Sequence, residues 1–248
     1  MDSIGFIGAL SGGAALFRGL SGFGYALIAT VALTGLLPAS VLVPVVLIND
    51  LVLTLLTLGD WRTSPPDRSV SGILVATGLV GAPLGSVLAG LLDPMTAKVL
   101  VSIAVAIAAL VALLPRPPRW LAARAFGIAL GLIVGVMLGA FAVGGPLIAA
   151  WLLAGGTEAR RVRGTLAIYF GAVDLMSLAS RAALGTLDPE FAHILAYAAL
   201  PTLAGFGGGL LLSHRLSPET WRRIAASSLA LIAVAGLVQA LRALAFSP

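Results

Sequence analysis

Long apolar runs, separated by short polar segments, make up almost the whole chain. Two of them, 3–37 and 125–157, are unusually long. As one straight helix the first would reach about 52 Å, at about 1.5 Å per residue. A helix needs only about 20 residues to cross a bilayer core of about 30 Å. Six further runs have about that length, at 39–59, 69–92, 96–114, 164–182, 191–213 and 221–245.

Glycine interrupts both of the long runs. Because glycine lacks a side chain and keeps its backbone freedom, a cluster of glycines weakens a helix at that point. Each long run is therefore predicted to be a re-entrant pair of half-helices or one long interrupted helix. The interruptions are Gly12-Gly13, Arg18-Gly19, Gly22 and Gly24 in the first run, which Pro38 ends, and Gly139 and Gly144-Gly145-Pro146 in the second.

Composition agrees with this pattern and sets the class of protein. The 248 residues are 59% hydrophobic and 10% charged, and the mean hydropathy is +1.08. Soluble domains carry about 25% charged residues. We therefore predict an all-α integral membrane protein with a lipid bilayer around it and no separate soluble domain. The net charge of +5 is then explained by basic residues at cytoplasmic helix ends rather than by nucleic acid.

The chain also contains an internal repeat, with the two halves matching at an offset of half its length. Repeats of this kind are typical of secondary transporters. The rigid basic loop around Pro115–Trp120 is the predicted boundary, giving a first repeat at 1–116 and a second at 117–248. The matched positions are Asp50-Leu51 with Asp174-Leu175, Pro65 with Pro189, Gly81 and Gly85 with Gly205 and Gly209, Lys98 with Arg222, and, with a small gap, Gly24 with Gly145.

The basic residues predict that the second repeat is inverted. Suppose that each broken stretch returns to its own side, so that each half then crosses the membrane three more times. Of the 15 basic residues, 11 then face one side and 3 face the other, and Arg18 lies within the membrane. The positive-inside rule then places both termini outside, in the periplasm. Two full crossings by each broken stretch give the same count, so charge leaves both versions open. The majority side holds Arg62, Arg68, Arg116, Arg119, Arg124, Arg160, Arg161, Arg163, Arg215, Arg222 and Arg223, and the other side holds Lys98, Arg181 and Arg242.

The candidate site lies at the two breaks. An arginine inside lipid is costly, and its fork of donors binds two oxygens of a sulfonate, sulfite or carboxylate. The N-termini of half-helices offer free N–H groups to an anion. The alternative for the glycines in the spans is close helix packing, and we prefer it for the glycines of 81–85 and 205–209. The alternative for Arg18 is that its side chain reaches a membrane interface or pairs with Asp50. The predicted substrate-binding residues are Arg18, Ser21, Gly22, Gly24, Tyr25, Gly144 and Gly145.

Two aspartates and an asparagine are polar positions within the predicted spans. Asp50 and Asp174 are equivalent in the repeat, and Asn49 lies beside Asp50. Buried carboxyls are a usual proton-coupling device, so protons are a candidate coupling ion. The alternative is that these side chains hydrogen-bond the broken helices and hold their shape. His193 and His214 lie near span ends, where a histidine at the membrane interface is expected.

No enzyme signature is present. The chain has no cysteine, and it shows no His/carboxylate metal spacing, phosphate loop or Gly-x-Ser-x-Gly motif. With 10 acidic residues in all, there is little room for a hidden hydrolase site. We predict no catalytic residues, no metal and no cofactor. A membrane-embedded enzyme or assembly factor would need a polar cluster that the sequence does not contain.

Three motifs together resemble the TauE/SafE family of sulfite exporters. They are the broken stretch Gly19-Leu-Ser-Gly-Phe-Gly24, its counterpart from Gly135 to Pro146, and Arg161-Val-Arg-Gly-Thr165. Phe23 and Tyr25 stand where the family often has a further glycine and a proline. The resemblance covers the whole chain. It implies export of sulfite, organosulfonates and related small anions across the bacterial inner membrane.

The predicted function is a secondary transporter that exports a small sulfur-containing anion by alternating access of two halves around a midplane site. The alternatives are an anion channel, which shares the repeat and the basic pore, and a transporter of a small carboxylate. The substrate, the coupling ion, the direction and the oligomeric state stay open at this point.

Overall fold

A computed structural model describes residues 2–34, 36–59, 65–92 and 123–213, with isolated positions beyond them. Two predicted spans, 96–114 and 221–245, and the predicted boundary near residue 116 lie outside the described residues. His214 also lies outside them.

Every element in the described part of the chain is a helix, as the apolar pattern predicts. Backbone polar groups in lipid must be paired within the protein, and a helix pairs them within one segment. The elements are α1 (Asp2–Ser21), α2 (Tyr25–Leu33), α3 (Ala39–Gly59), α4 (Arg68–Ala89), α6 (Arg124–Phe141), α7 (Gly145–Ala154), α8 (Ala159–Ala183) and α9 (Glu190–Ser213).

The same order of helices occurs twice. A long helix and a short helix are followed by two long ones, with 20, 9, 21 and 22 residues in α1 to α4 and 18, 10, 25 and 24 residues in α6 to α9. In the described residues five helices are long and apolar enough to cross a membrane, namely α1, α3, α4, α8 and α9. The chain is thus an all-α multi-pass membrane protein. The inversion of one half relative to the other stays a prediction.

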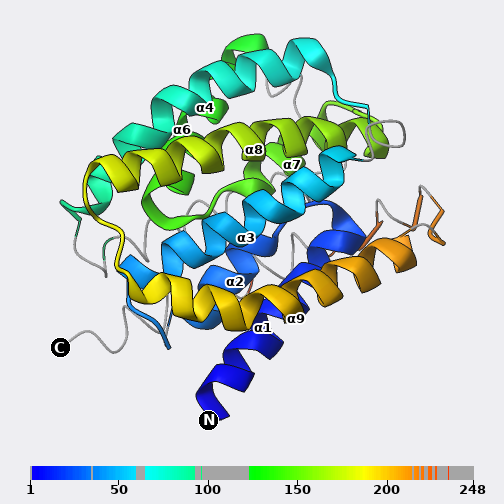
Figure 1. Cartoon of the computed structure of the whole chain (residues 1–248). Coiled ribbons are helices and arrows are strands. Elements are labelled where there is room, and N and C mark those ends of the chain that lie inside the picture. The colour runs from blue at the N-terminus through cyan, green and yellow to red at the C-terminus, as the bar shows by residue number, and fades with distance from the viewer. Residues whose placement is uncertain are drawn as a thin grey trace.

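Helices from different halves of the chain pack side by side. α1 packs along α9, and α4 packs along α6, so each outer pair takes one helix from each half. α3 and α8 lie between these pairs and contact each other (Figure 1). The short helices α2 and α7 each follow a break and pack against α3 and α8 respectively. The breaks therefore lie next to the central helices.

Glycines allow the outer pairs to approach closely, which confirms the packing interpretation for 81–85 and 205–209. A Cβ on Gly81 or Gly85 would meet backbone atoms of α6. A Cβ on Gly205 or Gly209 would meet backbone atoms of α1. Small residues at such crossings are typical of membrane helices.

Three of the predicted interruptions are wrong, and one of them, Arg18-Gly19, lies inside the continuous helix α1. Gly139 lies inside the continuous helix α6, where a Cβ would meet the backbone of Ala82 in α4. Gly12 and Gly13 lie inside the continuous helix α1, and a Cβ on Gly12 would lie 2.9 Å from the Pro201 carbonyl oxygen. Packing against a neighbouring helix offsets the weak propensity of glycine at these positions. The first break is confined to residues 22–24.

Most predicted span limits hold within a few residues, and 39–59 coincides with α3. The clear exception is α8, which begins at Ala159 rather than at residue 164. The predicted span began only after the basic cluster Arg160, Arg161 and Arg163. Arginine is a good helix former, so α8 continues through this cluster.

Candidate functional site

The first break is a tight turn between α1 and α2. α1 ends at Ser21, and Gly22 and Gly24 follow with φ of 87° and 93°. Side chains rarely adopt this left-handed backbone, which explains the glycines. The Ser21 hydroxyl lies 2.9 Å from the Phe17 carbonyl oxygen and 2.8 Å from the Phe23 carbonyl oxygen. Ser21 therefore stabilises the turn through backbone hydrogen bonds.

Arg18, in the last turn of α1, is almost fully buried with 2% of its surface exposed. Its Nη1 lies 3.1 Å from Asp50 Oδ1, and its Nη2 donates to Thr54 Oγ1 at 2.5 Å. Asp50 and Thr54 are one turn apart on α3, so both face the same guanidinium. The guanidinium carbon lies 5.5 Å from the centre of the Phe170 ring, a cation–π distance.

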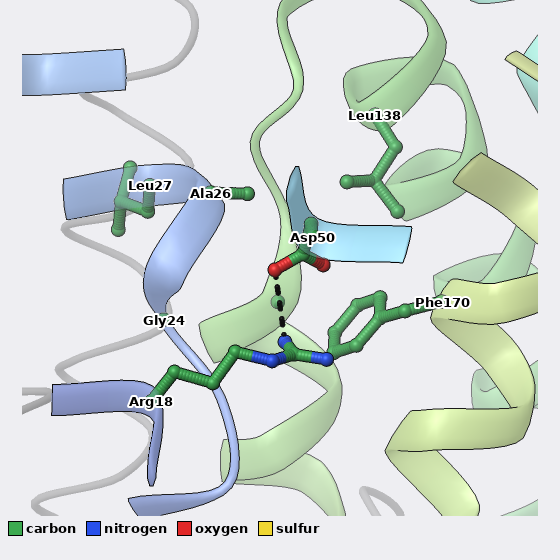
Figure 2. A pocket seen from close by; sticks show the side chains of 8 residues that line it. Arg18, Gly24, Ala26, Leu27, Asp50, Leu138 and Phe170 are labelled. Atoms are coloured by element: carbon green, nitrogen blue, oxygen red, sulfur yellow. Dashed lines mark ion pairs between the residues drawn. The ribbon is translucent and has the colours of Figure 1, made fainter. Parts of the chain in front are cut away.

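A small cavity adjoins this ion pair. Its volume is about 10 Å³, which is roughly the space that one water molecule needs. Figure 2 shows the Arg18 side chain running from the end of α1 toward Asp50, with the Phe170 ring beside the guanidinium. An anion larger than water can therefore enter only if side chains around the cavity move. It is lined by Arg18, Gly24, Ala26, Leu27, Asp50, Leu138, Gly145 and Phe170.

The second break reaches the same cavity from the other half of the chain. α6 ends at Phe141, Ala142 has φ of 55°, and Gly144 has φ of 149°. Gly145 then begins α7 and lines the cavity. A Cβ on Gly145 would lie 3.0 Å from the Phe170 ring. Glycine at this position thus lets the backbone of α7 approach that ring.

The N-termini of the short helices are directed to this region. Gly24 caps α2 and Gly144 caps α7, and neither helix start receives a side-chain cap from the described part of the chain. The first N–H groups of a helix have no partner within the helix and carry a partial positive charge. Gly24, Ala26 and Gly145 line the cavity, so both helix starts lie beside it.

Two arginines of α8 hold the ends of the long helices that precede the breaks. Arg163 donates to the Leu20 carbonyl oxygen of α1 at 2.5 Å and to the Ser213 hydroxyl at 3.3 Å. Arg181 donates to the carbonyl oxygens of Gly139 and Ala140 in α6, both at 2.8 Å. Cations at helix C-termini satisfy exposed carbonyl groups and complement the dipole. The sequence prediction used both arginines as indicators of membrane topology, and Arg163 also as part of a family motif, but it predicted no contact for either.

The two aspartates of the repeat meet in the interior. Asp50 is 1% exposed and Asp174 is 0% exposed. They lie on α3 and α8, which pack against each other, and their charges interact. Asn49, next to Asp50, is 4% exposed, and its Nδ2 makes no hydrogen bond within the described part of the structure.

The predicted site residues thus divide into two sets. Arg18, Gly24 and Gly145 line the cavity, together with Asp50. The others, Ser21, Gly22, Tyr25 and Gly144, lie at the breaks but outside the cavity lining. Tyr25 is fully buried, and its hydroxyl lies 2.9 Å from Ser11 Oγ.

The sequence prediction missed several residues of the site. Thr54 lies four positions after Asp50, a spacing that places both on one face of a helix, so this residue was detectable. Phe170 and Leu138 are apolar residues in apolar runs, and nothing in the pattern distinguishes them. Among the described residues, no group of three or more His, Cys, Asp or Glu side chains is arranged to hold a metal ion.

These features define a multi-pass membrane protein with a buried cation and two broken helices around a small internal cavity, an arrangement typical of secondary transporters. The family model described as "Sulfite exporter TauE/SafE" matches residues 5–236. The chain therefore belongs to the TauE/SafE family of sulfite exporters. Membership implies exporter-type membrane transport of a small sulfur-containing anion. Comparisons with curated proteins and with solved structures found no match.

Proposed function

We propose that this protein is a secondary transporter that exports sulfite or an organosulfonate by alternating access, with Arg18 as the ligand of the anion. The observation that carries this proposal is the burial of Arg18 beside a cavity at the first break. A buried arginine is costly in a membrane, and such residues commonly mark substrate pathways. Protons are the coupling ion that we propose.

In the anion-free protein, Asp50 occupies the position that we assign to the substrate. Its carboxylate oxygen lies 3.1 Å from Arg18 Nη1. A sulfite or sulfonate group presents oxygens of similar charge and can accept two parallel hydrogen bonds from a guanidinium. The anion therefore displaces Asp50 from Arg18. Thr54, which already accepts from Nη2, helps to orient the guanidinium.

The two short helices supply the remaining contacts in this proposal. The starts of α2 and α7 lie beside the cavity, and helix N-termini bind anions through backbone N–H groups. In this role Gly24 and Gly145 admit the anion close to the backbone. Ser21, Gly22, Tyr25 and Gly144 act indirectly, by fixing the two turns.

The arginine caps support two halves that approach the site from opposite sides. Arg163 and Arg181 are 18 residues apart on α8, about 27 Å along the helix axis. One holds the end of α1 and the other the end of α6. We propose that the halves, 1–116 and 117–248, are inverted, that both termini are periplasmic, and that the protein lies in the bacterial inner membrane.

A small carboxylate is the second candidate substrate. The specific observation in its favour is the Arg18–Asp50 pair itself, because it places a carboxylate on the proposed ligand. Acetate would reproduce this contact with fewer oxygens than a sulfonate offers.

Flux into proteoliposomes tests the function. Sulfite, taurine, sulfoacetate and acetate are each supplied with and without an imposed pH gradient, and protein-free liposomes serve as the blank. We expect saturable flux of sulfite or sulfoacetate that responds to the gradient. Flux that does not saturate would indicate a channel, and a preference for acetate would favour the carboxylate. No flux of any probe above the blank would contradict the proposal.

A further inference from the structure

Three buried charged side chains lie together at the centre of the protein, and their charges do not balance. Arg18, Asp50 and Asp174 are at most 2% exposed. Arg18 forms its ion pair with Asp50 at 3.1 Å. If both aspartates were ionised, the group would carry one uncompensated negative charge away from water. An unpaired charge in such a place is strongly disfavoured.

The hydrogen bonds also indicate a missing proton at Asp174. Both of its carboxylate oxygens are buried, and neither finds a hydrogen-bond donor among the described residues. Buried carboxylate oxygens normally have donors. The Asp50 carboxyl lies on the neighbouring helix α3 and interacts with Asp174, but two carboxylates offer only acceptors. One proton between them would supply the missing donor and remove the extra charge.

No other group around the pair supplies a compensating charge in the described structure. Tyr169 on α8 donates its hydroxyl to the Gly131 carbonyl oxygen, and Tyr25 on α2 pairs with Ser11. Arg181 lies two turns beyond Asp174 and binds backbone carbonyls of α6. The outer helices that pack against α8 have an ionisable residue only at their first positions, Arg68 in α4 and Arg124 in α6. The helix α9, which packs against α3, carries Glu190, His193 and Tyr197 on its exposed surface.

We propose that Asp50 and Asp174 form a proton site that holds one proton in the anion-free protein and takes up a second when an anion occupies Arg18. This inference rests on the proposed function. With one proton, the three side chains are neutral, because Asp50 compensates Arg18 and Asp174 is protonated. A monoanion on Arg18 displaces Asp50, and the released carboxylate then becomes neutral by binding a proton from water.

The consequence for transport is fixed stoichiometry. A monoanion moves with one proton, so the transport step carries no net charge. Flux of a monoanion should therefore be insensitive to membrane potential, and export should proceed when the outward anion gradient exceeds the opposing pH gradient. A dianion moving with one proton would carry one negative charge.

Infrared spectroscopy of the anion-free protein at pH 7 tests the first proton without any substrate. The carbonyl stretch of a protonated carboxyl should be present in the wild type. Asp174→Asn and Asp50→Asn should each remove it, because the one remaining carboxylate then compensates Arg18. Glu219→Gln is the control, since Glu219 is an exposed carboxyl paired with Arg223, and it should keep the band. A wild-type spectrum without the band would overturn the proposal.

Proton counting by calorimetry tests the second proton. Methanesulfonate is the probe because it stays a monoanion at all working pH values. Titrations in buffers of different ionisation enthalpy should give about one proton taken up per anion in the wild type and in each single variant. The double variant Asp50→Asn/Asp174→Asn should take up none. Wild-type affinity should then fall by up to about tenfold per pH unit as pH rises, whereas the affinity of the double variant should not change.

The outcomes separate the two proposals. Binding of methanesulfonate without proton uptake in the wild type would overturn the proton site and leave the anion site intact. Absence of any binding would contradict the anion site and the proton coupling that rests on it. Proton uptake that persists in the double variant would assign the proton to another group and overturn the inference.

Discussion

At the first break the chain turns through Gly22 and Gly24, and at the second it turns through Ala142 and Gly144. Both turns follow a long helix and precede a short one that starts with no side-chain cap from the described residues. Only the first break brings a charge to the cavity, through Arg18. The shared geometry provides two helix starts, whereas the chemistry of anion binding belongs to one side.

Each break also places a residue in the hydrophobic core of the opposite half. Phe23, of the first break, packs in the cluster formed mainly by α6, α7 and α8. Ala142, of the second break, packs in the cluster formed mainly by α1, α2 and α3. A movement of one half therefore disturbs the other break, which is a physical basis for coupling between the halves. The single arginine makes the site asymmetric, so we expect the anion nearer the first break.

Arg18→Ala should have the largest effect on this comparison, because it makes the first break as uncharged as the second. Loss of one partner of a buried charged contact costs about 2 to 5 kcal/mol, so anion affinity should fall at least about 30-fold. Calorimetry with sulfite in detergent micelles measures it, with size-exclusion chromatography to check folding. Arg68→Ala, which removes an exposed arginine, is the control and should bind as the wild type does. Equal affinity in the two variants would refute the role of Arg18.

The arginine caps give the next largest effect, and the two breaks should respond differently. Arg181→Ala leaves the buried Ala140 carbonyl without its donor, at a cost of about 1 to 3 kcal/mol, and leaves the Gly139 carbonyl with only the long bond from the Ser86 hydroxyl at 3.4 Å. Its thermal unfolding midpoint in detergent should fall clearly. Arg163 is only partly buried, so water can replace it, and Arg163→Ala should lower the midpoint less.

Anion affinity should show the reverse order for these caps. Arg163 holds the last turn of α1 through the Leu20 carbonyl oxygen, and that turn carries Arg18. Arg163→Ala should therefore weaken sulfite binding more than Arg181→Ala does. The same order in both measurements would contradict a separate role for each cap.

The sequence predicted much of this arrangement because its strongest signals are local. Apolar run length determined the spans, and the clusters Gly22–Gly24 and Gly144–Pro146 marked both breaks. Asp50 and Asp174 were found through the repeat. The charge of Arg18 in an apolar run directed the prediction to the first break, and Arg18 lines the cavity there.

The missed features depend on contacts between distant segments. Gly139 and Gly12 are packing positions because α4 and α9 lie against them, and a sequence pattern does not contain that proximity. Phe170 lines the cavity through the crossing of α8 with the first break. Arg181 donates hydrogen bonds to carbonyl oxygens that lie 41 and 42 residues earlier in the chain.

A smaller effect is expected from Gly22→Ala. The residue has φ of 87°, where an L side chain costs about 1 to 2 kcal/mol. Its Cβ would lie 2.6 Å from Arg163 Cγ, so the cap must also shift. We expect a lower unfolding midpoint and weaker sulfite binding. Gly13→Ala is the matched control, because this helical glycine has no described atom within 4 Å of an added Cβ. It should be neutral or stabilising.

Ala142→Gly at the second break should have the smallest effect, although its backbone also lies in the left-handed region, with φ of 55°. Glycine relieves about 1 to 2 kcal/mol of strain there. Loss of the buried methyl costs about 0.8 kcal/mol, and the added freedom of the unfolded chain costs about 0.4 to 1 kcal/mol. These contributions nearly cancel, so the unfolding midpoint should stay close to that of the wild type. A large destabilisation would show that the Ala142 methyl group, through its contacts with the first half, matters more than the turn geometry that the two breaks share.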